Sequence, residues 1–195
     1  GIDMGDCNLS LSNVLISNNS GYNNSGGIYA MHSNPSLDFI TITNNTHTGQ
    51  LNAGGLYLHY SNFTIKNSII QDNTGLDLHI DDSSINASYS NLDLNGTGNI
   101  NADPQFTDPD NGDYTLQSTS PCIDAGDPDS LLDPDGTRAD MGAYPYEQYQ
   151  NSINLHEGAN LISFYAIPKD NSVENVLLSI SDISEGIISE GFASA

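Results

Sequence analysis

Two short motifs recur along the first part of the chain, and both keep the same spacing. One is a run of β-branched and apolar residues ending in Asn-Asn or Asp-Asn, found at 13–20, 39–46 and 67–74. The other begins with a glycine and then alternates in polarity, and it starts at Gly1, Gly27, Gly55 and Gly75. The first two intervals are 26 and 28 residues for both motifs, and 20 residues separate Gly55 from Gly75. A period of this length, shared by two unrelated motifs, predicts stacked structural repeats.

The residues inside each motif alternate as in a β-strand with one buried face. Asn-Asn, Gly-Gly and Ser-Asn pairs lie between the motifs, and they accept turn dihedrals. No stretch of residues 1–150 combines helical periodicity with helix caps. Strands that repeat without helices between them predict an all-β parallel β-helix, a solenoid over residues 1–100. Ile16, Ile42 and Ile70 are expected to stack inside it on successive coils.

Two columns of side chains follow from this register. Asn19, Asn45 and Asn73 share one turn position, where their amides are expected to form a hydrogen-bonded ladder with a structural role. The outward position of the glycine-led strand is a candidate ligand-binding column, in which rings flanked by carboxylates would contact sugars. The alternative is that its two tyrosines stack on each other and stabilise the sheet. The members of this column are Asp3, Tyr29, Tyr57 and Asp77.

Acidic residues dominate the charge of the chain. The chain contains three Lys and Arg residues and 25 Asp and Glu residues, which gives a formal charge of −22. Such a surface repels phosphate backbones, so nucleic acid is not expected as a partner. One acidic loop is a candidate Ca²⁺ site, because oxygen-rich turns suit this ion, although carboxylates that cap turns in solvent would look the same. Its carboxylates are Asp124, Asp127, Asp129, Asp133, Asp135 and Asp140.

Residues 1–150 resemble the right-handed parallel β-helix repeat proteins of bacterial surfaces, which share the fold of the pectate lyases. The resemblance is strongest in the segments 102–106, 111–116, 120–127 and 140–144, which are similar to the usual ending of that group. It implies that residues 101–150 wrap the C-terminal end of the solenoid. It also implies a secreted or surface-anchored protein, but the group is functionally mixed and specifies no reaction.

The pattern changes after residue 150. A strand is predicted over 161–165 and an amphipathic helix over 172–181, so residues 151–195 are expected to begin a small α+β domain. This segment resembles the opening of small C-terminal modules that precede sorting or anchoring segments, and the chain is expected to be truncated at both ends. No run of about 20 apolar residues is present, so membrane insertion is not expected.

The expected function is a non-catalytic structural, adhesive or glycan-binding segment. Lyases of this fold class use a Lys or Arg base, and residues 1–150 contain only Lys66 and Arg138. Asp81 and Asp82 are adjacent and would point to opposite faces of a strand. Two alternatives remain open: a carbohydrate-active enzyme with its catalytic coils elsewhere, and a filament formed by end-to-end stacking. The histidines have no ligand spacing, and a pairing of Cys7 with Cys122 is undecided.

Overall fold

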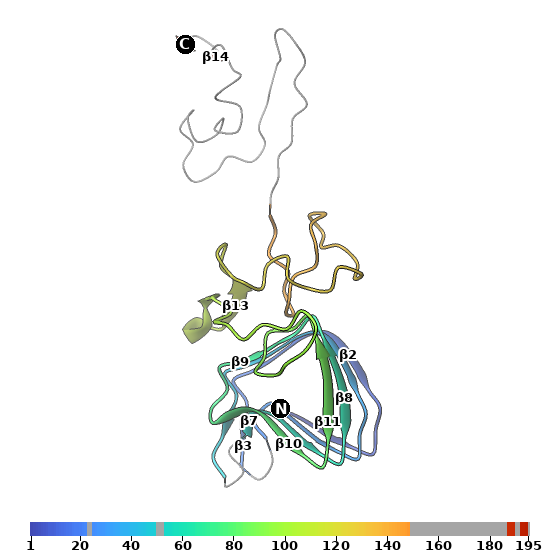
Figure 1. Cartoon of the computed structure of the whole chain (residues 1–195). Helices are drawn as coiled ribbons and strands as arrows, with labels where there is room; N and C mark the ends of the chain where they lie inside the picture. Colours follow the sequence, from blue (N-terminus) through green and yellow to red (C-terminus); the bar gives the residue numbers. More distant parts are fainter. Residues whose placement is uncertain (23–24, 50–52, 149–186, 190–191, 195) are drawn as a thin grey trace. The chain divides into compact units, whose positions relative to one another are not determined.

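A computed structural model describes residues 1–22, 25–49, 53–148, 187–189 and 192–194. The chain divides into two compact units, Gly1–Gln150 and Asn151–Ala195. The first unit is a β-solenoid of about three turns, which Figure 1 shows nearly along the axis of its coils. The prediction of an all-β parallel solenoid is therefore confirmed.

The first sheet of the solenoid contains one strand from each successive coil, and all its pairs are parallel. In spatial order the strands are β1 (Ile2–Gly5), β4 (Ile28–Met31), β7 (Ala53–His59) and β10 (Leu76–Asp81). Ile28 and Ala30 point inward and are fully buried, as are Leu56 and Leu58 on the next coil. These side chains stack because the parallel register places each one over its equivalent.

The second sheet follows the same rule. Its strands are β2 (Ser10–Ser17), β5 (Ser36–Thr43), β8 (Asn62–Lys66), β9 (Ile69–Gln71) and β11 (Ser84–Ser88), and β5 pairs with both β8 and β9. Ile42 pairs with Ile16 on one side and Ile70 on the other, and all three are buried, as predicted. A third, short sheet joins β3 (Ser20–Gly21) to β6 (Thr46–His47).

Each coil turns at sharp corners where a non-glycine residue adopts the left-handed conformation, with φ between 45° and 61°. Asn and Asp, which tolerate this conformation best, fill many of these positions. The first corner is Asp6, His32, Tyr60 and Asp82; the second is Asn13, Phe39, Asn67 and Tyr89; the third is Asn18, Asn44 and Asp72. The second corner always lies seven positions after the first, and the third corner lies five positions after the second.

The residue after each corner carries the hydrogen bonds that link one coil to the next. At the first corner, the backbone N–H of Ser33 donates to Ser61 Oγ at 3.0 Å, and the Ser61 N–H donates to Ser83 Oγ at 2.8 Å. At the second corner, the N–H groups of Ile40 and Ser68 donate to Ser68 Oγ and Ser90 Oγ. A buried N–H needs such an acceptor wherever the backbone bends out of the sheet ladder.

The third corner is followed by the asparagine ladder of Asn19, Asn45 and Asn73. The backbone N–H and the side-chain amide of Asn19 both donate to Asn45 Oδ1 at 3.0 Å. Asn45 donates in the same way to Asn73 Oδ1, again at 3.0 Å. The ladder ends on Asp77, whose Oδ1 accepts from the Asn73 N–H at 2.9 Å and from its amide at 2.8 Å. A carboxylate therefore occupies the place of the next asparagine.

Residues 91–101 cover part of the C-terminal end of the coils, where Ile80, in the inward column of Leu58, stays 41% exposed. Leu92 is fully buried and packs with the apolar core of the solenoid, and Leu94 is partly buried against it. Asn99 Oδ1 accepts from the Ser90 N–H and so continues the second-corner ladder. Figure 1 shows this segment, in yellow-green, at one edge of the opening that the coils enclose.

The closing segment, residues 102–148, packs against outward residues of the second sheet. That residues 101–150 wrap the end of the solenoid stays a prediction. The closing segment contains the antiparallel pair β12 (Phe106–Asp108) and β13 (Asp113–Leu116), joined by a short 3-10 helix, η1 (Pro109–Asn111). An apolar cluster unites its Phe106, Tyr114, Leu116, Cys122 and Met141 with Ile69 and the partly buried Leu15 of the second sheet. The outward positions Leu15, Thr41 and Ile69 stack on successive coils, and only a cover on this side buries them.

The second unit is described only in part. β14 (Ile187–Ser189) and β15 (Phe192–Ser194) form an antiparallel pair. The predicted strand over 161–165 and the predicted helix over 172–181 lie outside the described residues. Across the part of the chain that is described, no helix has the length and apolarity needed to cross a membrane.

Candidate functional site

The outer surface of the first sheet and its corner carry three parallel columns of side chains, which we call the aromatic face. The β-strand register aligns Asp3, Tyr29, Tyr57 and His79 in one column and Gly5, Met31, His59 and Asp81 in the next. The first corner adds a third column. Its members are Asp6, His32, Tyr60 and Asp82. Tyrosine and histidine rings thus occupy the two middle coils, the last coil carries the His79 ring, and carboxylates lie on the first and last coils.

The predicted column was wrong at its last member. Asp77 does not follow Tyr57, because the register shifts between Leu76 and Leu78 and brings His79 opposite Tyr57. The interval from Tyr57 to His79 is 22 residues, not 20, so the glycine of Gly75 is not the equivalent of Gly55. Asp77 is instead the end of the asparagine ladder.

Tyr57 is enclosed by its neighbours. Its ring centroid lies 5.2 Å from that of Tyr29 and 4.7 Å from that of His79, the latter in an edge-to-face arrangement. The residue is only 7% exposed. Burial, with the nearby Asp81 carboxylate and Tyr29 adding to it, raises the pKa of the Tyr57 hydroxyl. Ring-to-ring packing therefore accounts for Tyr57, and a ligand would meet the neighbouring groups instead.

The accessible rings are at the corner column. The rings of His32 and Tyr60 stack face to face, with centroids 5.3 Å apart and planes within 5° of parallel. Tyr60 is 49% exposed, and its ring also lies 4.2 Å from that of His59. His59 Nδ1 in turn contacts Asp81 Oδ2 at 2.7 Å. His32, Tyr60 and His59 were not among the predicted site residues, although the constant spacing between corners was a signal that could have aligned them.

The acidic loop is organised by backbone hydrogen bonds to its carboxylates. Asp140 is 2% exposed; its Oδ1 accepts from the Asp124 N–H at 2.7 Å and its Oδ2 from the Tyr146 N–H at 2.6 Å. Asp133 Oδ2 accepts from the Asp140 N–H, and Asp135 accepts from the N–H groups of Thr137 and Gln148. Burial, with the Asp133 and Asp124 charges adding to it, raises the pKa of Asp140 to about 6.

In the described residues, the carboxylates of this loop do not form the ligand set that the predicted calcium site needs. Asp127 uses Oδ1 to accept from the Asp129 N–H and Oδ2 to bind Lys66 Nζ at 2.6 Å, and Asp129 is exposed. Asp124 Oδ2 accepts from the Gln148 amide, while Asp124 Oδ1 is buried without a hydrogen-bond partner. Among the described residues, no group of three or more His, Cys, Asp or Glu is arranged to hold a metal ion. Ca²⁺ binding therefore stays a prediction.

The two basic residues of the first unit also hold the closing segment in place. Lys66 pairs with Asp127 of the closing segment, and this pair raises the pKa of the lysine. The next residue, Asn67, also contacts the closing segment, because its carbonyl accepts from the Gly142 N–H. The Arg138 Nε donates to the Gly126 carbonyl at 2.7 Å, and its guanidinium lies 5.8 Å from the Tyr89 ring centre. Both cations are thus engaged away from the aromatic face.

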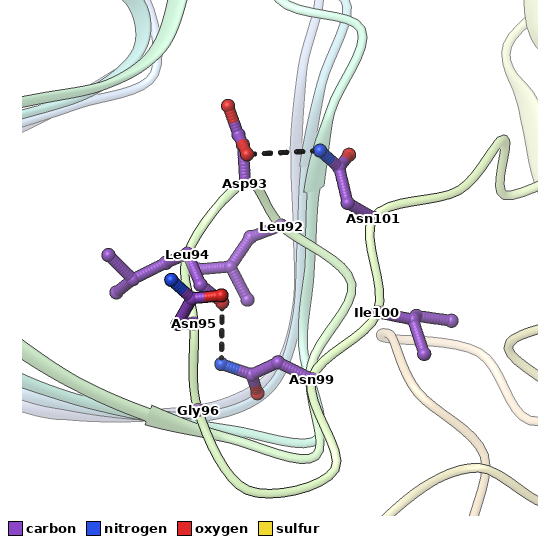
Figure 2. Close-up of a pocket in the computed structure, with 8 residues that line it drawn as sticks. All are labelled: Leu92, Asp93, Leu94, Asn95, Gly96, Asn99, Ile100 and Asn101. Carbon is purple, nitrogen blue, oxygen red and sulfur yellow. Dashed lines mark hydrogen bonds between the residues drawn. The ribbon is translucent and has the colours of Figure 1, made fainter.

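A hollow of about 320 Å³ lies within the segment that covers the end of the coils. Figure 2 shows its lining, including two hydrogen bonds inside the segment. Asn101 donates to Asp93 Oδ1 at 3.1 Å, and the Asn99 amide donates to the Leu94 carbonyl at 3.1 Å. These polar groups shape the loop itself, so we do not assign a ligand to the hollow.

The two cysteines are both free thiols in the structure. Cys122 is fully buried in the apolar cluster of the closing segment, and burial raises the pKa of its thiol to about 11. Such a thiol is a poor nucleophile at neutral pH, so Cys122 has a packing role.

The arrangement on the aromatic face can bind but has no complete catalytic constellation in the described residues. Phenol hydroxyls, imidazoles and carboxylates together donate and accept hydrogen bonds along the coil axis. Neither the comparison with curated proteins nor the comparison with solved structures gives a match. The model of one protein family, described as a right handed beta helix region, matches residues 1–119. Repeat spacing, parallel register and this match agree, and the chain belongs to the right-handed β-helix family.

Proposed function

We propose that this chain is a non-catalytic segment of a secreted or surface-anchored protein, and that its aromatic face binds a glycan. The observation that carries the proposal is the corner stack of His32 and Tyr60, two rings with accessible polar edges between the exposed carboxylates of Asp6 and Asp82. Sugars are recognised by such mixed surfaces, because hydroxyl groups pair with polar edges while apolar ring faces contact C–H groups.

The contrast between the two sides of the solenoid supports this choice. The outward residues Leu15, Thr41 and Ile69 of the second sheet pack under the closing segment, whose contacts lie on this sheet and its corners. Other outward residues of this sheet, such as Ser12, Thr64 and Asn86, are exposed and polar. The outward residues of the first sheet are instead aromatic and ionisable. A surface that keeps such side chains at partial exposure is better suited to recognition than to packing.

Absence of catalysis is part of the proposal. Lys66, the only Lys or Arg in the coils, forms an ion pair with Asp127, and this pair favours the charged form of the amine. A protonated amine cannot abstract a sugar proton, so Lys66 in this state would not serve a lyase. End-to-end stacking is less well supported than glycan binding, because Leu92 and Leu94 pack on part of the apolar core at the C-terminal end of the coils.

Tyr60→Ala tests the proposed surface. Binding to an immobilised panel of neutral, acidic and amine-bearing polysaccharides is expected to weaken by roughly fivefold for the glycan that the wild type retains, because an accessible ring contact contributes about 1 kcal/mol. Tyr144→Ala is the matched control, since Tyr144 is 43% exposed on the closing segment. Equal loss in both variants, or release of reducing or unsaturated sugar ends by the wild type, would contradict the proposal.

A further inference from the structure

The charges of the aromatic face all have one sign, apart from the histidines. Its three columns contain the carboxylates of Asp3, Asp6, Asp81 and Asp82 and no Lys or Arg. Three of these carboxylates belong to exposed residues, and Asp81 is partly exposed beside His59. Lys66 and Arg138 are held by Asp127 and the Gly126 carbonyl. The face therefore offers an anionic ligand no described Lys or Arg partner, and it repels one.

The aromatic rings also favour a cationic ligand over an anionic one. The face of an aromatic ring carries the negative part of its quadrupole and attracts cations within about 6 Å. In the corner column, the rings of His32 and Tyr60 stack on each other, and Asp6 and Asp82 hold the same corner position on the coils to either side. The Tyr60 ring also lies 4.2 Å from the ring of His59. A tyrosine ring beside a carboxylate is an arrangement that suits an ammonium group, because the ring and the carboxylate both stabilise it.

The length of the face sets a limit on the ligand. It spans four strands, and neighbouring strands lie about 4.8 Å apart, so it extends over roughly 14 Å along the coil axis. Carboxylates occur at both ends of this span, and rings occur in its middle and, with His79, at one end. A short stretch of polymer with charged groups repeated along it matches that layout better than a single small cation does.

We infer that the ligand class of this face is an amino-sugar polymer with free ammonium groups, bound along the coil axis at Tyr60, His32, Asp6 and Asp82. The inference rests on the proposed glycan binding and specifies its chemistry. An N-acetylated polymer of the same length lacks the cation, and a uronate polymer carries the opposite charge. The face is thus expected to discriminate between glycans by the charge of their substituents.

The experiment compares a glucosamine oligomer with its N-acetylated form of equal length by isothermal titration calorimetry, at pH 6 and in 150 mM salt. This salt screens the long-range attraction of the acidic surface, so the remaining preference reports the local site. The free amine oligomer is expected to bind at least tenfold more tightly. Asp6→Asn with Asp82→Asn should remove most of this preference, and asparagine keeps the left-handed corner that both positions require.

The control variant combines Asp110→Asn with Asp129→Asn, which removes the same charge from exposed positions of the closing segment. It should bind the amine oligomer as the wild type does. Equal losses in both double variants would show attraction to the acidic surface in general and overturn the inference. Equal affinity for both oligomers, with loss of both in Tyr60→Ala, would overturn the amine preference and leave glycan binding intact. No binding of any glycan would overturn both.

Discussion

Asp140 is an ionisable side chain held almost out of water by two backbone N–H donors. Its carboxylate connects the turn at Asp124 to the chain near Tyr146, so the loop depends on it for shape. Desolvation outweighs these two hydrogen bonds and raises its pKa from 3.8 to about 6. The ionised form is consequently less stable in the folded protein than in water, and the stability of the protein depends on pH through this group.

The protein is expected to be more stable at pH 5 than at pH 7.5. A carboxyl with a raised folded-state pKa contributes stability below its unfolded pKa, near 3.8, and loses it as the pH rises through about 6. A shift of this size corresponds to about 3 kcal/mol, roughly half of it between pH 5 and 7.5. The raised pKa values of Asp133 and Asp72 act in the same direction. Urea unfolding at both pH values measures the difference.

Asp140→Asn should flatten this dependence, whereas Asp129→Asn at an exposed position should keep it. Below about pH 4 the trend should reverse, because Asp127 and Asp135 have lowered pKa values and lose their hydrogen-bonded ionised form there. The same slope in wild type and Asp140→Asn between pH 5 and 7.5 would show that another group controls the dependence.

The ladders are the elements that hold one coil to the next at the corners. In the asparagine ladder, Asn45 is fully buried and its amide donates to the carbonyls of Ile16 and Thr43 as well as to Asn73. Asn19 is half-buried and accepts no ladder bond from another coil of the described chain. An inner member of the ladder therefore satisfies more buried groups than an outer one.

Asn45→Ala is expected to lower the free energy of unfolding by about 2–4 kcal/mol, because several buried donors and acceptors lose their partners. Asn19→Ala should lower it by less than half as much. Asp77→Asn should be close to neutral, since asparagine restores the residue type of the ladder, while Asp77→Ala should be destabilising. Chemical denaturation of the four variants measures these values. An Asn19→Ala effect as large as that of Asn45→Ala would mean that the ladder does not act through buried hydrogen bonds.

Many of the strands were predictable from the sequence, because every coil of a solenoid needs apolar residues at the same interior positions. The positions of Ile16, Ile42 and Ile70 followed from the shared 26- and 28-residue intervals. The sequence misaligned the last coil because Asp77 lies two residues after Gly75, as Tyr57 does after Gly55. In the structure, the Asp77 carboxylate instead replaces an asparagine amide in the ladder. The sequence predicted only part of the aromatic face. Tyr29 and Tyr57 lie on strands and follow from the alternation of polarity, whereas His32 and Tyr60 lie at corners, which that alternation does not reveal.

At the scale of the whole first unit, the closing segment and the coils share one apolar cluster. Ile69 is 1% exposed between them, and the Ala143 N–H donates to Thr41 Oγ1 at 2.9 Å. Repeat proteins often unfold coil by coil, since each repeat contacts only its neighbours. A segment that lies across several coils couples them, so we expect residues 1–148 to unfold in one step.

Ile69→Ala tests this coupling. Truncation of a buried isoleucine is expected to cost about 2–5 kcal/mol. Amide hydrogen exchange should then accelerate by a similar factor at Ile42 in the coils and at Met141 in the closing segment. Ile80→Ala is the control, because Ile80 is 41% exposed on the last coil and its truncation should cost less. Acceleration confined to Met141 would mean that the closing segment opens independently.

The constant seven and five residues between corners leave all variation in coil length to one arc, from the third corner to the first corner of the next coil. That arc has 14 residues after Asn18, 16 after Asn44 and 10 after Asp72. Insertions and deletions accepted during evolution would therefore accumulate at one edge of the protein, between the asparagine ladder and the strands of the first sheet. The same edge is where a foreign peptide could be grafted into a coil without displacing the coils on either side.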